Sequence, residues 1–95
     1  MTTPQNPAMP PEVARFLLLV ELCRKLGELG CSSYLVNLAA GGAVLHVDRR
    51  TEPPSRLSVA AVERSDGWVY VWEGHCAEVS RLEQLAAHLA GADRP

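Results

Sequence analysis

The chain lacks any apolar segment long enough to span a membrane, which takes about 20 apolar residues. The apolar run at residues 16–20 is followed at once by Glu21 and Arg24, and no positively charged stretch precedes it, as a signal peptide would require. An excess of charge of one sign is also missing, because nine Lys and Arg residues face eleven Asp and Glu residues, for a net charge of −2. The sequence therefore predicts no membrane partner and no general attraction to nucleic acid.

Cysteine is scarce. Cys23, Cys31 and Cys76 make an odd number, far below the density of a disulfide-stabilised secreted domain. We therefore expect a protein of the reducing cytoplasm. Cys23 and Cys31 are eight positions apart, whereas structural zinc sites usually pair their ligands about two to four residues apart, so we expect no metal site.

Motifs that carry chemistry are missing as well. The pair Gly41-Gly42 has neither the P-loop spacing nor the dinucleotide fingerprint, and no serine has the strand, turn and helix setting of a hydrolase nucleophile. We expect a non-enzymatic protein without a cofactor. One alternative stays open, a small thiol-based enzyme or sensor. Its thiol would be Cys31 or Cys76, and its base would be His46 or His75.

An amphipathic pattern over residues 12–29 predicts a helix with an unusually wide apolar surface. At about 100° per residue, its apolar side chains cover roughly 200° of the circumference, about twice the stripe of an ordinary surface helix. Pro11 suits the first helical turn, and Gly30 suits a left-handed cap after the last. One half of the apolar surface holds Val13, Phe16, Leu17, Val20 and Cys23, and the other holds Leu18, Leu22, Leu26 and Leu29.

Alternation with a period of two begins at Ser33 and predicts strands. Gly41-Gly42 indicates a two-residue hairpin loop, and Pro53-Pro54 should keep the following connection out of the sheet. Such a loop implies three cross-strand pairs. It places Tyr34 on the core face, together with the two pairs that are apolar. The implied pairs are Val36 with Val47, Asn37 with His46, and Leu38 with Leu45.

A second hairpin is predicted from residues 57–64 and 68–72, with Asp66-Gly67 as its loop. Its aromatic side chains, at alternate positions, share a face with Leu57 and Val59, which favours core packing over a stacking platform for nucleic-acid bases. The opposite face carries three valines and is a candidate ligand surface or second interface. The aromatic residues are Trp68, Tyr70 and Trp72, and the valines are Val62, Val69 and Val71.

A last helix should begin near Ser80, where Ser80 and Glu83 have the spacing of a capping box, and should end at Gly91. The elements predict an α+β fold: an N-terminal helix, a four-stranded antiparallel β-meander and a C-terminal helix, with both helices on one face of the sheet. The domain spans residues 11–92, between a flexible tail at 1–10 that contains prolines and a short tail at 93–95.

Two polar groupings also have functional interpretations. His46 and Asp48 share one strand face, and Asn37 is predicted opposite His46, so an imidazole oriented by a polar partner is one hypothesis. A cluster of arginines in and beside the central loop could meet phosphate, although surface loops commonly carry such charges. The arginines are Arg49, Arg50 and Arg56.

The first helix has more apolar surface than a small sheet can cover. If the sheet and last helix cover the half that contains Phe16, the other half lacks a partner within the chain. We therefore predict a homodimer interface at Leu18, Leu22, Leu26 and Leu29. The predicted function is a regulatory or adaptor module that self-associates through this helix. A different protein as partner, and packing of sheet against sheet, stay open as alternatives.

Overall fold

The computed structural model describes residues 10–37, 42–49 and 55–91. The helices are α1 (Pro11–Glu28) and α2 (Leu82–Leu89), and a 3-10 turn, η1 (Val79–Arg81), precedes α2. Several predicted features lie outside the described residues: positions 1–9 of the N-terminal tail, the C-terminal tail, Leu38, the Gly41 half of the glycine loop, Arg50 and Pro53-Pro54. The strands are β1 (Ser33–Asn37), β2 (Ala43–Arg49), β3 (Ser55–Arg64), β4 (Gly67–Trp72) and β5 (His75–Glu78).

The five strands form one antiparallel sheet in the order β1-β2-β3-β4-β5. The predicted α+β fold is confirmed, with five strands where four were predicted. The additional strand, β5, returns from β4 through a two-residue turn at Glu73-Gly74, where both residues have positive φ, 45° and 78°. Strand β3 is shared between two ladders, because it pairs with β2 from Ser55 to Val59 and with β4 from Ala60 to Arg64.

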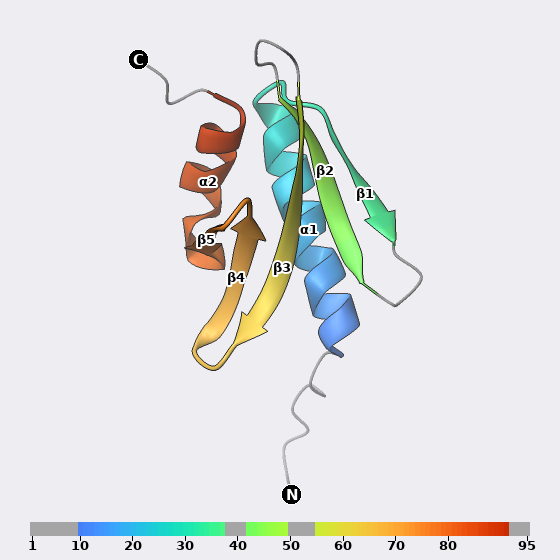
Figure 1. The fold of residues 1–95 in the computed structure, drawn as a ribbon, viewed down its shortest axis with the longest axis vertical. Helices are drawn as coiled ribbons and strands as arrows, with labels where there is room; N and C mark the ends of the chain where they lie inside the picture. The colour runs from blue at the N-terminus through green and yellow to red at the C-terminus, as the bar shows by residue number, and fades with distance from the viewer. Residues whose placement is uncertain (1–9, 38–41, 50–54, 92–95) are drawn as a thin grey trace, which may run out of the picture.

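Both helices pack on the same face of the sheet, which we call the inner face (Figure 1). Helix α1 runs along β2 and β3, and the shorter α2 lies beside the β4–β5 end. Tyr70 and Trp72 are 1% and 9% exposed and belong to the core, and Trp68 packs against it, which confirms the core interpretation of the aromatic strand. None of the described helices is long and apolar enough to cross a bilayer.

The ends of α1 follow from its sequence. Pro11 occupies the first turn, where its missing N–H is not needed. After the last turn, Gly30 adopts a φ of 79°, Cys31 N donates to the Leu26 carbonyl at 2.8 Å, and Gly30 N donates to the Gly27 carbonyl at 3.0 Å. These two bonds form a Schellman motif, so the predicted left-handed cap is confirmed.

The side of α1 that faces the sheet is the reverse of the predicted one. Leu19, Leu22 and Leu26 have no exposed surface, while Val13, Phe16 and Leu17 are exposed. Arg15 lies on the buried side as well: its Nε donates to the carbonyl oxygen of Ala61 at 3.1 Å, and its guanidinium lies 5.9 Å from the centre of the Trp68 ring. The leucine half of the helix therefore forms the monomer's own core.

The register of the first hairpin also differs from the predicted one. Leu35 pairs with Leu45, and Ser33 pairs with Val47. A two-residue Gly41-Gly42 loop would pair Leu38 with Leu45, so β1 is shifted by three residues from its predicted register. An odd shift moves every side chain of a strand to the other face. As a result, Tyr34 and Val36 lie opposite His46 and Val44 on the outer face, away from the helices, and do not join the core.

The second hairpin is two residues out of the predicted register and keeps its faces. Arg64 pairs with Gly67, so the loop is Ser65-Asp66, and Tyr70 pairs with Ala61. An even shift leaves each side chain on its predicted side. Ser80 does not cap α2, because η1 intervenes and the helix begins at Leu82 without a side-chain cap. Its predicted end is confirmed by the φ of 78° at Gly91.

Candidate functional site

The largest exposed apolar side chains of α1 gather on the side that faces away from the sheet. Val13, Phe16 and Leu17 are 44%, 41% and 44% exposed, and Val20 is half-buried on the same side. Their spacing of three, four and seven residues places them on one helical stripe. We call Val13, Phe16, Leu17 and Val20 the helix patch.

A charged cluster bounds the helix patch toward the C-terminal end of α1. The Arg24 guanidinium contacts the carboxylates of Glu21 at 2.9 Å and Glu28 at 2.6 Å, and Lys25 Nζ lies 3.4 Å from Glu28. The hydrogen bond from Arg24 to Glu21 raises the pKa of Arg24, with the charges of both carboxylates adding to it. The apolar part of this side is therefore confined to the first half of the helix.

The predicted interface leucines are not together at the surface. Leu22 and Leu26 are fully buried, Leu18 is half-buried against the core, and Leu29 alone is exposed, at 44%. A second copy of the chain cannot reach Leu22 or Leu26 in the folded monomer. The exposed apolar side chains that α1 offers to a second copy are therefore mainly those of the helix patch.

The outer face of the sheet is the second apolar surface that the described part of the chain leaves uncovered. Val62 pairs with Val69 and Ala60 with Val71, and all four point away from the helices, as predicted for the three valines. Val62 is 39% exposed, whereas Val69 is 8% exposed and Val71 is half-buried. Val36 and Val44 extend this surface across β1 and β2.

His46 lies at the polar end of the outer face, and its neighbours differ from the predicted ones. His46 Nδ1 lies 3.1 Å from Ser58 Oγ, and its ring centre lies 5.4 Å from that of Tyr34. Arg56 reaches across β2, with its guanidinium 5.5 Å from the Tyr34 ring and its Nε 3.6 Å from Asp48. The predicted partner Asn37 pairs with Ala43 and is not opposite His46.

Two of the central-loop arginines are engaged with carboxylates. Arg49 Nη1 lies 3.4 Å from Glu73, and Arg56 pairs with Asp48, while Arg50 lies outside the described residues. These neighbours neutralise much of the positive charge that a phosphate group would need.

The thiols and imidazoles of the alternative hypothesis do not come together. Cys31 is buried on the inner face, where its Sγ lies 3.7 Å from the Asp48 carbonyl oxygen, whereas the His46 side chain lies on the outer face. Cys76 pairs with Val71 on the outer face, while His75 points to the inner face, 5.7 Å from the Trp72 ring. Cys31 with His46, and Cys76 with His75, are therefore not arranged as a nucleophile and its base.

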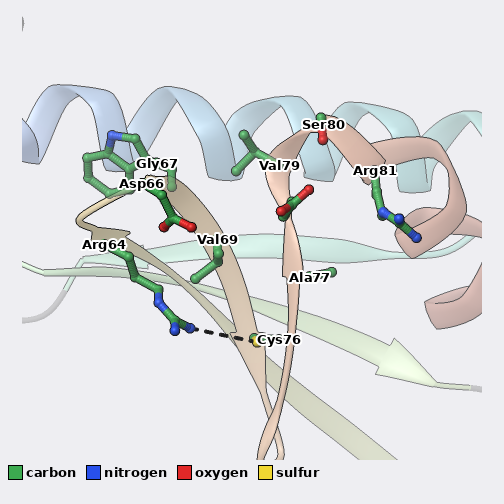
Figure 2. A pocket seen from close by; sticks show the side chains of 11 residues that line it. Arg64, Asp66, Gly67, Val69, Cys76, Ala77, Val79, Ser80 and Arg81 are labelled. Carbon is green, nitrogen blue, oxygen red and sulfur yellow. Dashed lines mark hydrogen bonds between the residues drawn. The ribbon is translucent and has the colours of Figure 1, made fainter.

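A groove of about 680 Å³ opens beside Cys76, where β5 runs into η1 and separates from the start of β4 (Figure 2). We call it the edge groove. Apolar side chains of Val69, Ala77 and Val79 line part of it. Its ionisable and nucleophilic side chains are Arg64, Asp66, Cys76, Glu78, Ser80 and Arg81.

The edge groove depends on β5, the strand that the sequence patterns did not predict. The signal was available in the Glu-Gly pair at 73–74, since a two-residue turn that ends in glycine is typical of hairpins. Among residues 10–37, 42–49 and 55–91, no three His, Cys, Asp or Glu side chains form a group that could hold a metal ion. No family model, curated protein or solved structure matches this chain.

Proposed function

We propose that this chain is a non-enzymatic protein-interaction module, of regulatory or adaptor type, that forms a homodimer through the helix patch. The observation that carries the proposal is the exposure of three neighbouring large apolar side chains, Val13, Phe16 and Leu17, each at more than two-fifths. Its setting would be the reducing cytoplasm, in keeping with a content of only three cysteines, Cys23, Cys31 and Cys76.

A helix stripe fits another helix well, because side chains three and four residues apart form ridges that enter the grooves of a neighbour. The patch spans Val13 to Val20, about 10 Å along the axis at about 1.5 Å per residue. Two copies of α1 related by a two-fold axis near Leu17 would bring each patch onto the other. The ion-paired cluster around Arg24 would then lie at the rim of the contact.

The expected dimer is weak and reversible. Full burial of a Val, Leu or Phe side chain contributes about 1.5–3 kcal/mol, and about two-fifths of each remains to be buried here. Six such side chains in a dimer yield a gross gain of about 6 kcal/mol, from which the cost of association is subtracted. Such a contact suits a regulated module better than an obligate dimer.

The test is a set of three glutamate variants matched for exposure. Leu17→Glu lies in the helix patch, Leu29→Glu lies at the C-cap of the same helix, and Val62→Glu lies on the outer face of the sheet, with exposures of 44%, 44% and 39%. Sedimentation equilibrium measures the dimerisation constant of each. The proposal expects Leu17→Glu to abolish dimerisation while the other two dimerise like the wild type.

Two outcomes contradict the proposal. If Val62→Glu alone abolishes the dimer, the outer face of the sheet is the interface. If Leu29→Glu alone does so, the contact lies at the C-terminal end of α1. Circular dichroism of each variant verifies that the fold is intact, which is expected because all three positions are exposed.

A further inference from the structure

The edge groove combines an accessible thiol with charged groups of both signs. Cys76 is exposed, and its Sγ lies 4.0 Å from Nη1 of Arg64 (Figure 2). Arg81 lines the same groove from η1. Within the described residues neither arginine forms an ion pair, in contrast to Arg24, Arg49 and Arg56.

These groups define the chemistry of a ligand. Two guanidiniums without a carboxylate partner suit two carboxylates, since guanidinium and carboxylate form charge-assisted hydrogen bonds. Asp66 and Glu78, which also form no ion pair within the described residues, suit an ammonium group. A volume of about 680 Å³ lies in the range of small-molecule sites. This set of groups therefore fits a small amino-acid-like or peptide-like molecule better than a simple anion.

We propose that the edge groove binds a small disulfide built from acidic, peptide-like thiols and that Cys76 exchanges with it to form a mixed disulfide. The Cys76 thiolate attacks one sulfur of the bound disulfide. A new S–S bond forms to Cys76, the original S–S bond breaks, and the leaving thiolate takes the electron pair and then a proton from solvent. The disulfide is the oxidant, and a second thiol reverses the step.

The other two cysteines provide controls within the same molecule. Cys31 is 8% exposed, and Cys23 is half-buried, with its sulfur 3.1 Å from Ser33 Oγ. Neither lines the edge groove. Thiol exchange requires access to the sulfur and is favoured by a nearby positive charge, so only Cys76 meets both conditions.

The experiment compares two disulfides, glutathione disulfide, which carries carboxylates and ammonium groups, and the neutral bis(2-hydroxyethyl) disulfide. Mass spectrometry of the intact chain and of its peptides measures the rate of adduct formation at each cysteine, in the folded chain and in concentrated urea. We expect Cys76 to react before Cys23 and Cys31. We also expect the ratio of its rate with glutathione disulfide to its rate with the neutral disulfide to be higher in the folded chain than in the unfolded one. Since the net charge of −2 repels an anionic reagent, a preference has to come from the groove.

Arginine variants show whether the groove causes the preference. Arg64→Gln and Arg81→Gln should each lower it by about two- to fivefold, the size of one partly exposed ion pair. Arg49→Gln is the matched control, because Arg49 pairs with Glu73 and does not line the groove, and it should leave the preference unchanged. The proposal is overturned if folded and unfolded chains show the same preference, if Arg64→Gln and Arg81→Gln leave it unchanged, or if Cys23 reacts before Cys76.

Discussion

The Tyr70 hydroxyl donates a hydrogen bond of 2.8 Å to the main-chain carbonyl oxygen of Leu18. The bond joins β4 to the middle of α1 across the core, and Tyr70 is only 1% exposed. Leu19, Leu22 and Leu26 pack on the same side of the helix. The orientation of α1 that exposes the helix patch is thus fixed by a polar contact as well as by apolar packing.

Removal of this hydrogen bond by Tyr70→Phe should lower the free energy of unfolding by about 1 kcal/mol, the usual net contribution of one such bond. The cost should not exceed this by much, because the ring still fills its place in the core. Urea denaturation measures this loss of stability as a lower midpoint concentration at an unchanged slope of the unfolding free energy. An unaltered midpoint would mean that the contact contributes nothing to the orientation of α1.

The same hydroxyl should make the fold sensitive to alkali. Burial, with a smaller contribution from the charge of Glu21, raises the pKa of Tyr70 to about 12 from 10.0. Between these pH values the unfolded chain loses the proton that the folded chain retains, so stability is full below pH 10 and falls by about 2 to 3 kcal/mol as the pH rises to 12.

The control for this pH effect is Tyr70→Phe, which has no proton to lose at this position. The difference in unfolding free energy between wild type and variant should shrink and reverse sign from pH 9 to pH 12, by about 2 to 3 kcal/mol in total. Parallel pH profiles of the two proteins would show that Tyr70 ionises as readily when folded as when unfolded.

Two alanine variants of α1 separate its buried and exposed leucines. Leu22→Ala should cost about 2 to 5 kcal/mol, because it empties a fully buried position. Leu29→Ala should cost less than about 1 kcal/mol, since the side chain is 44% exposed. Thermal or urea unfolding at low protein concentration measures both. Equal costs would contradict the orientation of the helix.

The turn between β4 and β5 should tolerate, and gain from, a different residue at position 73. Glu73 has a φ of 45°, a left-handed conformation that costs most residues about 1 to 2 kcal/mol and that asparagine adopts more readily. Glu73→Asn should therefore raise stability by about 0.5 kcal/mol or more. It also removes the ion pair with Arg49, which is exposed on the Glu73 side and contributes little. Lower stability would show that the ion pair outweighs the backbone conformation.

The types of α1, α2 and the first four strands could be predicted from the sequence, because each has a clear periodicity or cap, whereas β5 and η1 were not predicted. The pattern of α1, the glycine caps at Gly30 and Gly91, and the inward placement of Tyr70 and Trp72 are local properties that the structure retains. Even the two-residue error in the second hairpin preserved its faces, since strand geometry repeats every two residues.

What could not be predicted depended on choices between two similar surfaces. Both halves of α1 are apolar, so the assumption that the sheet covers the half with Phe16 had no support in the local pattern. In β1, Leu35 on one side and Tyr34 with Val36 on the other are comparably apolar, so the prediction of which side faces the core depended on the assumed length of the loop. These choices are made by tertiary contacts such as Tyr70 to Leu18, which no local pattern contains.

The most direct test of the central claim, that α1 pairs with a second copy through the helix patch, is the mass of the wild-type chain in solution. Light scattering across a concentration series from about 10 μM to about 1 mM covers the range expected for a weak dimer. The account predicts a rise from 10.3 kDa toward twice that value, and no rise for Leu17→Glu. A wild-type mass that stays at 10.3 kDa throughout would contradict it.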